Sequence, residues 1–237
     1  MIGYFLCVDL LGFSEIIKNL SPEKANSKIE SWVALIEELV GYYEIEKYQL
    51  VSDTLFIGLG DAAEDLNKII KFAHDLLNRS IPQSLIIRGS ITLGEYVWGK
   101  LVYGPAVIKA HTLEKSQNWI GIVLDNDIKI EDVYYIQKII TYPVPMNSNQ
   151  MIILYNTISW QVPSYSDLAS LTCRDGLGGV PGEGKPLNWD WATKISNTVL
   201  FGCYSRAITI MGKDRSKFYG LHPVQFVELT LQNIMNS

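Results

Sequence analysis

Two hydrophobic periodicities alternate along roughly the first half of the chain. Uninterrupted apolar runs of about four to eight residues indicate buried strands, whereas apolar residues spaced three and four apart indicate helices with one buried face. Expected strands are 2–8, 44–51, 54–59, 84–93 and 119–124, and expected helices are 14–42, 62–79 and 105–118. This order is typical of an α+β fold of the ferredoxin-like kind, in which an antiparallel-rich sheet carries its helices on one face.

The pattern weakens after residue 140, where Pro143 and Pro145 interrupt the sequence. We therefore expect a core domain at 1–140 and a C-terminal α/β extension at 141–237, packed on or beside the core. Two details of the core are also expected: a pairing of 95–102 back on the strand at 84–93, and a helix start at Ser21-Pro22. In the extension we expect a strand at 151–155 and helices at 191–211 and 223–235.

Composition narrows the classes of protein that the chain can represent. It has 237 residues, of which 48% are hydrophobic and 19% charged, so it can bury a sizeable core and is not intrinsically disordered. Its net charge of −5 argues against general nucleic-acid binding, which needs basic surface. No uncharged apolar stretch reaches the roughly 18–20 residues of a membrane helix. Three widely spaced cysteines favour a reducing, cytoplasmic location.

Two aspartates stand at the ends of apolar strands. Asp9 ends the first predicted strand and is followed by Gly12 at a helix start, where main-chain N–H groups suit a phosphate and the carboxylate suits a hard cation. Asp53 lies in a tight turn between two predicted strands. If that hairpin neighbours the first strand, the two carboxylates converge, and cations would offset their repulsion. Taken alone, each aspartate is more often a helix cap or a turn residue.

Together these segments resemble the class III nucleotide cyclase family. Residues 9–14 (DLLGFS) are similar to the family's strand end, Asp-Ile-x-Gly-Phe-Thr/Ser. Ser52 and Asp53 stand where the family's hairpin carries Gly-Asp. The offset between Asp9 and Asp53 (53 − 9 = 44 residues) is like that between the family's two metal-binding aspartates.

Two downstream segments extend the resemblance. Residues 88–95 (RGSITLGE) look like the family's Arg-x-Gly-x-His-x-Gly-Glu strand, although details differ. Residues 104–114 (GPAVIKAHTLE) look like its Gly-x-x-Val-Asn-x-Ala-x-Arg-Leu-Glu helix. The resemblance covers about residues 2–126, and its most specific part is the combination of the two aspartate motifs.

The resemblance implies an enzyme that cyclises a nucleoside triphosphate and releases pyrophosphate. Asp9 and Asp53 would bind two divalent cations, Mn²⁺ or Mg²⁺, and the Leu10 carbonyl would complete one coordination sphere. Such sites form between two subunits, so a head-to-tail homodimer is implied. The implied substrate contacts are Gly12, Phe13 and Ser14, whose main chain would hold the β- and γ-phosphates, together with Tyr48, Gln49 and Ser52.

The chain departs from the family pattern on the helix at 105–118. Ile108 stands where the family has its ribose-orienting Asn, and Thr112 where it has its transition-state Arg. Lys109 and Arg88 are the nearest cations that could act in their place as catalytic residues. Lys109 is equally typical of a solvated helix position.

The base-reading position differs as well. The family's purine-reading Lys, four residues before the hairpin aspartate, is replaced by Gln49, with Tyr48 beside it. Tyr48 could stack on a smaller base, although a strand Tyr more often faces the core. The chain therefore looks most like the pyrimidine cyclases of the bacterial Pycsar anti-phage systems, with UTP favoured over CTP.

That resemblance implies a downstream effector that responds to cyclic UMP or cyclic CMP without binding the cyclase. Two alternatives stay open. One is a purine cyclase with a rearranged base pocket. The other is an inactive, cyclase-derived domain that senses nucleotides, which Ile108 and Thr112 favour but the two retained aspartates do not.

Overall fold

The computed structural model describes residues 1–130, 138–147, 152–174 and 189–211. The strands are β1 (Ile2–Leu10), β2 (Tyr48–Val51), β3 (Thr54–Gly58), β4 (Ile87–Glu95), β5 (Val97–Trp98), β6 (Val102–Tyr103), β7 (Gly121–Leu124), β8 (Ile139–Pro145) and β9 (Ile152–Ile158). The helices are α1 (Phe13–Asn19), α2 (Pro22–Tyr42), α3 (Ala63–Ser80), α4 (Pro105–Ser116), α5 (Tyr165–Arg174) and α6 (Trp189–Met211), with a 3₁₀ turn at Ile81–Gln83.

One sheet organises the described part of the chain. Its seven strands lie in the order β2-β3-β1-β4-β7-β9-β8, and every neighbouring pair is antiparallel except β4 and β7. The predicted α+β class with an antiparallel-rich sheet is confirmed. The long helical segment divides at Ser21-Pro22, as the proline predicts, into α1 and α2.

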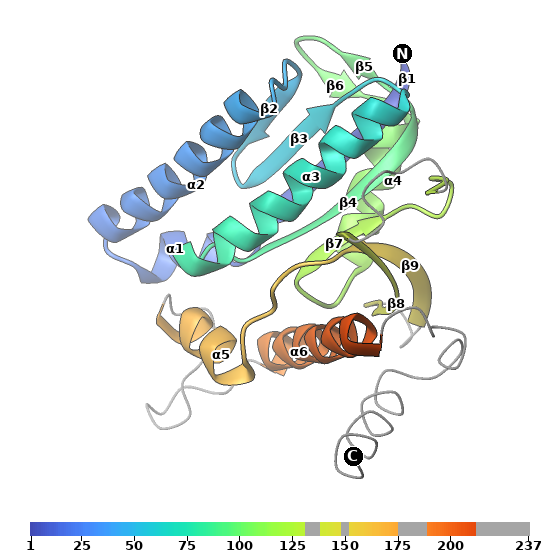
Figure 1. Cartoon of the computed structure of the whole chain (residues 1–237). Helices are drawn as coiled ribbons and strands as arrows, with labels where there is room; N and C mark the ends of the chain where they lie inside the picture. The colour runs from blue at the N-terminus through green and yellow to red at the C-terminus, as the bar shows by residue number, and fades with distance from the viewer. Residues whose placement is uncertain (131–137, 148–151, 175–188, 212–237) are drawn as a thin grey trace.

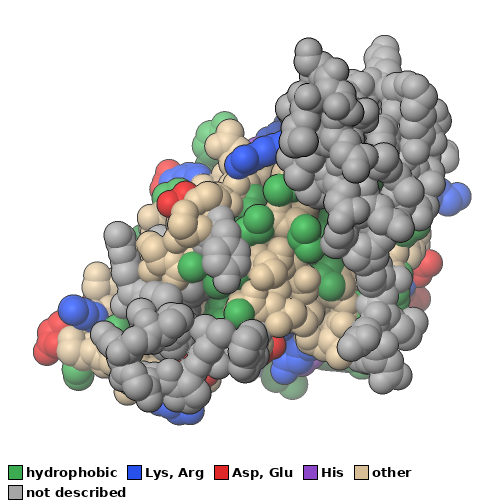
Figure 2. All heavy atoms as spheres, turned by 90° about the horizontal axis from the view of Figure 1, so that it is seen from below, with side chains coloured by type: hydrophobic (Ala, Val, Ile, Leu, Met, Phe, Trp, Pro, Cys, Tyr) green, Lys and Arg blue, Asp and Glu red, His purple; other side chains and the backbone are tan. Residues whose placement is uncertain are grey.

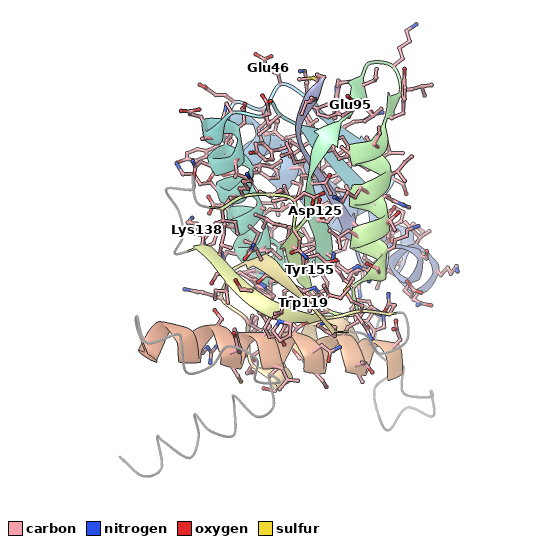
Figure 3. The ribbon with its side chains drawn as sticks, turned by 90° about the vertical axis from the view of Figure 1, so that its right-hand side faces the viewer. Glu46, Glu95, Trp119, Asp125, Lys138 and Tyr155 are labelled. Atoms are coloured by element: carbon pink, nitrogen blue, oxygen red, sulfur yellow. The ribbon has the colours of Figure 1, made fainter. Side chains whose placement is uncertain are left out.

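Helices cover both faces of this sheet, so the prediction that they lie on one face is wrong for α4. Along β1, Leu6 and Val8 belong to the large core that includes α2 and α3. Phe5 and Cys7, which point the other way, belong to a smaller core with Ala110 of α4. In Figure 3, α3 and α4 accordingly lie on opposite sides of the sheet. A helical repeat shows only that a helix has a buried stripe, not which sheet face that stripe covers.

The predicted pairing of 95–102 with the strand at 84–93 is also wrong. β5 and β6 instead pair with each other in a separate two-stranded sheet. Tyr96 turns the chain away from β4, because its side chain is buried and its hydroxyl donates to the Leu59 carbonyl oxygen at 2.7 Å. The amide of Tyr96 donates to the Met1 carbonyl oxygen at 2.9 Å, which fixes this departure against the start of β1.

The extension continues the same sheet. β8 begins at Ile139, so a boundary at residue 140 falls inside a strand, and β9 pairs with β7. The expected strand near 151–155 and helix near 191–211 are present as β9 and α6. α6 runs below β8 and β9 (Figure 1), where Phe201 contacts the rings of Trp119 and Tyr142. The helix expected at 223–235 lies outside the described residues.

No helix within these described ranges is long and apolar enough to cross a membrane. Seen from below, from the side of α5 and α6, hydrophobic side chains gather in the middle of the face and charged ones lie toward its edges (Figure 2).

Thr198 connects α6 to the sheet, and this contact can be tested. The Thr198 hydroxyl accepts a hydrogen bond from the buried amide of Ile120 at 2.9 Å. Replacing Thr198 with Val would leave that amide unpaired, so we expect the free energy of unfolding to fall by about 1–3 kcal/mol in urea titrations. Thr141→Val is the matched control, because the Thr141 hydroxyl bonds Asn156 at an exposed position. Equal, small losses for both variants would contradict a tight attachment of α6.

Candidate active site

The sheet brings Asp9 and Asp53 together. β1 and β3 are antiparallel neighbours in which Asp9 lies opposite Thr54, the residue after Asp53. The Thr54 hydroxyl donates to Asp9 Oδ1 at 3.0 Å. The Leu10 amide donates to the carbonyl oxygen of Asp53 at 3.1 Å. The predicted neighbouring of the first strand and the hairpin is therefore confirmed, and the main chain of Leu10 lies against the hairpin tip.

Local sequence explains the sharpness of that tip. Val51 and Thr54 are paired, so only Ser52 and Asp53 form the turn between β2 and β3. Ser52 is exposed and adopts φ 58°, a left-handed conformation that glycine adopts more readily than serine. Asp53 is half-buried beside it, at the same end of the sheet as Asp9.

The environment of Asp9 opposes its negative charge. Burial raises the pKa of the Asp9 carboxyl, and the nearby Asp53 charge raises it further. The hydrogen bond from Thr54 and the charge of Arg88 offset part of this effect on the pKa. A buried carboxylate that has a second carboxylate beside it suits a divalent cation, which offsets the negative charge.

The donor set here fits metal ions that keep open coordination positions. The described residues hold no cluster of three or more His, Cys, Asp or Glu side chains arranged for a metal. Asp9 and Asp53 thus supply two carboxylates, and further oxygen ligands have to come from the main chain, such as Leu10, or from a substrate phosphate. Hard oxygen donors of this kind suit Mg²⁺ or Mn²⁺.

Arg88 lies opposite Asp9 on β4, yet other groups hold its guanidinium. Nε donates to Glu114 Oε1 at 2.8 Å, Nη2 lies 2.7 Å from the same oxygen, and Nη1 donates to the Gln117 carbonyl oxygen at 2.8 Å. Burial raises the pKa of Glu114, and the Arg88 charge and hydrogen bond oppose that rise. The sequence singled out Arg88 as a candidate but did not indicate that Glu114 is its buried partner. Glu114 is the last residue of the segment 104–114 that resembles the family's helix motif.

Lys109 does not lie beside Asp9 in the same chain. Its ammonium pairs with the carboxylates of Asp125 and Asp127. Burial lowers the pKa of Lys109, but the hydrogen bonds and charges of these two carboxylates raise it more, so the net shift is upward. The amide of Asp125 bonds the Ile91 carbonyl, three residues along β4 from Arg88. Asp125 and Asp127, rather than Asp9 and Asp53, are therefore the carboxylates that hold Lys109 within the chain.

The two candidate base contacts on β2 face opposite ways. Gln49 is paired with Phe56, whose ring packs in the small core on the α4 side. Asp9 shares that side with Cys7, by the alternation of β1. Tyr48, 40% exposed, has the orientation of Leu50, which packs toward the α2 and α3 core. The register therefore brings Gln49 to the face that carries Asp9 and directs Tyr48 away from it.

The turn after β1 exposes main chain beside the carboxylates. Gly12 has φ 79°, in the left-handed region, and precedes α1. The Phe13 side chain packs against the large core, whereas Ser14 is exposed. Phe13 can therefore contribute to a ligand site through its main chain only. Gly12 lines a small pocket that also includes Arg88.

Comparisons with solved structures identify the fold. The chain superposes on a bacterial light-regulated adenylyl cyclase with a TM-score of 0.54 and 14% identity, covering 74% of this chain and 56% of that one. It superposes on the catalytic core of a rhodopsin-guanylyl cyclase with converted specificity, in complex with ATPαS, with a TM-score of 0.53, 15% identity and coverages of 67% and 95%. It has the fold of a class III nucleotide cyclase catalytic domain.

A third structure agrees with this fold. It is a non-canonical dimeric form of the guanylyl cyclase domain of the RhoGC fusion protein from the aquatic fungus Blastocladiella emersonii, with a TM-score of 0.50, 15% identity and coverages of 66% and 95%. No family model and no curated protein matches the chain. A coverage of 67% of 237 residues is about 159 residues, more than the 140 of the predicted core domain, so the matched fold includes part of the extension.

Because burial and the like charge of Asp53 disfavour the ionised form of Asp9, we expect this carboxylate to lower the stability of the metal-free protein while it serves metal binding. A carboxyl whose pKa is raised in the folded state destabilises the fold while it is ionised at neutral pH. We expect Asp9→Asn, which keeps the acceptor for Thr54, to raise the Tm at pH 7 by about 1–4 °C in scanning calorimetry. Mn²⁺ should raise the Tm of the wild-type protein but not of this variant.

Glu44→Gln provides the control, because Glu44 is exposed on the loop after α2 and lies outside the site. It should leave both the Tm and its response to Mn²⁺ unchanged. A lower Tm for Asp9→Asn, or an undiminished response to Mn²⁺, would argue against two converging carboxylates that share cations.

Proposed function

We propose that this protein is a pyrimidine nucleotide cyclase that converts UTP, in preference to CTP, to the 3′,5′-cyclic nucleotide and pyrophosphate. The observation that carries the proposal is the convergence of Asp9 and Asp53 at one end of a sheet with the class III cyclase fold. Two neighbouring carboxylates suit divalent cations, Mn²⁺ or Mg²⁺, and a triphosphate would complete the coordination of two such ions.

The reaction forms one bond and breaks another at the α-phosphorus. The ribose 3′-oxygen forms a bond to the α-phosphorus, the bond from that phosphorus to the bridging oxygen breaks, and pyrophosphate leaves with the electron pair while the 3′-hydroxyl loses its proton. When bound, the cations lower the pKa of the hydroxyl and neutralise charge on the phosphates. Asp9 and Asp53 would hold the cations, and the main chain of Gly12, which lines a pocket at this end of the sheet, would hold the β- and γ-phosphates.

Base selection is assigned to Gln49. Its side chain shares the sheet face of Asp9, and a carboxamide can pair with uracil or cytosine because its donor and acceptor exchange places on flipping. Gln49 replaces the lysine with which the resembling family reads purines, and this replacement favours the smaller bases. The adenylyl and guanylyl cyclases of similar fold act on purines, so a purine substrate is the second candidate.

A homodimer with sites between its subunits fits the exposed apolar residues on the α4 side. Ile108 on α4 is 69% exposed, and the β5–β6 hairpin exposes Leu101 and Tyr103. Grouped apolar residues of this kind are typical of protein interfaces. In such a dimer, Lys109 of one subunit would reach the aspartates of the other and release its pairing with Asp125 and Asp127.

In a bacterial cytoplasm, the cyclic pyrimidine nucleotide would act as the second messenger of an anti-phage defence system. A separate effector would detect it without contacting the cyclase. This biological role follows from the proposed substrate, so it holds only if the product is a cyclic pyrimidine nucleotide.

The test of the function is a panel of the four nucleoside triphosphates with Mn²⁺, with products identified by mass spectrometry. Cyclic UMP should dominate, with cyclic CMP second, and Asp53→Ala should reduce turnover at least about 100-fold while the Tm stays close to that of the wild type. Cyclic AMP or cyclic GMP as the main product would establish the purine alternative. Nucleotide binding without any product would establish the sensing alternative.

Gln49 and Tyr48 form a matched pair because they are neighbours on opposite faces of β2. Gln49→Ala should raise the KM for UTP by about 10-fold, as expected for the loss of hydrogen bonds worth roughly 1–2 kcal/mol, whereas Tyr48→Ala should change it less than about twofold. Steady-state kinetics of both variants measures this difference. A larger effect at Tyr48 would reverse the assignment of the base contact.

A further inference from the structure

A pocket joins the proposed site to the C-terminal extension. It has a volume of ≈ 430 Å³, within the range of small-ligand sites, and lies between the turn after β1 and the beginning of α6. Gly12 and Glu15 line it from one side and Arg88 from β4, while Lys194 of α6 lines it from the other. The pocket therefore collects groups from segments more than 170 residues apart in sequence (194 − 12 = 182).

The two cations of this pocket are both buried. Arg88 is 7% exposed and Lys194 is 9% exposed. Lysine is rarely buried to this extent without an anion, because the protein withdraws its ammonium from water. The anion that the structure gives Lys194 is Asp190, one helical turn earlier, whose side chain is 64% exposed.

This pairing leaves Lys194 available to a better anion. An ion pair of the i,i+4 type is weak when its carboxylate is as well solvated as that of Asp190. A phosphate group inside the pocket would offer charge-assisted hydrogen bonds in a drier setting, and these are stronger. The ammonium can therefore exchange Asp190 for a phosphate while the methylene chain stays between the pocket walls.

Hydrogen bonds connect the same pocket to Asp9. Arg88 is the strand partner of Asp9, and its Nη1 donates to the Gln117 carbonyl oxygen at 2.8 Å. Asn147, which follows β8 in the extension and also lines the pocket, donates to that same carbonyl oxygen at 3.2 Å. The extension is thus fixed to the group that positions Arg88, and the pocket lies at the end of the sheet where the carboxylates converge.

We propose that Lys194 binds the terminal phosphates of the substrate, and the pyrophosphate that leaves, within its own chain. This inference rests on the proposed function. As the bond between the α-phosphorus and the bridging oxygen breaks, negative charge accumulates on the departing pyrophosphate, and the ammonium stabilises it without giving up a proton. The extension then has a catalytic purpose, because α6 adds Lys194 to a pocket that the cyclase-like segment at 2–126 lines with Arg88.

Pyrophosphate binding to the full-length protein tests the inference directly. In calorimetric titrations with Mg²⁺ present, Lys194→Gln should weaken pyrophosphate binding by about 10- to 100-fold, the effect of losing a charged hydrogen bond. Lys194→Arg should retain most of the affinity. UMP, which lacks the two terminal phosphates, should bind both variants and the wild type equally.

Asp190→Asn separates phosphate binding from a structural role of the Lys194–Asp190 pair. If Lys194 binds phosphate, Asp190→Asn removes a competing anion and tightens pyrophosphate binding. If the pair only holds α6 in place, Asp190→Asn and Lys194→Gln weaken binding by the same factor, which would overturn the inference. Lys138→Gln, which removes a lysine paired with Asp75 away from the pocket, is the control and should bind pyrophosphate as the wild type does.

The outcomes also distinguish this inference from the proposed function. Wild-type affinity in Lys194→Gln, together with cyclic UMP production by the wild-type protein, would reject the role of Lys194 and leave the cyclase assignment in place. Pyrophosphate binding that depends on Lys194, without any cyclic product, would support the phosphate site and reject the cyclase assignment.

Discussion

The register between β1 and β3 is the constraint on which the candidate site depends. It places Asp9 against the tip of the hairpin that carries Asp53, and it is fixed by the hydrogen bonds of Leu10 and Thr54. A slip of one residue would turn Asp9 to the opposite face of the sheet, into the large core beneath α2 and α3. The buried residues on both faces of β1 therefore protect the position of a carboxylate whose own charge is disfavoured.

The two faces of the sheet differ in what they carry: one holds most of the hydrophobic core, and the other holds the candidate site residues. The α2 and α3 side holds most of the hydrophobic core and gives the domain its stability. The α4 side has a smaller core, and it presents Asp9, Gln49 and the Arg88–Glu114 pair near one end. Ile108 on α4 is exposed on this same side. β1 thus contributes to both sides: Leu6 and Val8 pack in the large core, and Asp9 lies on the opposite face.

Much of the core domain could be predicted from the sequence because its signals are local. Apolar strands on either side of Ser52-Asp53 predict the hairpin, and an apolar strand ending at Asp9 predicts the other half of the site. The same alternation, counted back from Thr54, would also have separated Gln49 from Tyr48, although the sequence reading placed both at the site.

Other features could not be predicted because they depend on contacts distant in sequence. A helical repeat does not say that α4 covers the second face of the sheet, and the partner of Arg88 lies 26 residues away on that helix. Lys194 approaches Gly12 only because β8 and β9 continue the sheet and the Thr198 hydroxyl fixes α6 beneath it. No local pattern near Lys194 indicates this proximity.

The central claim is that Asp9 and Asp53 together hold cations for a pyrimidine triphosphate. The most direct measurement is anomalous diffraction from crystals grown with Mn²⁺ and 3′-deoxy-UTP, which lacks the attacking hydroxyl and so cannot cyclise. The account predicts two manganese peaks, each within bonding distance of both carboxylates, with the triphosphate beside Gly12. Manganese bound elsewhere, or a nucleotide that binds without contacting either aspartate, would contradict it.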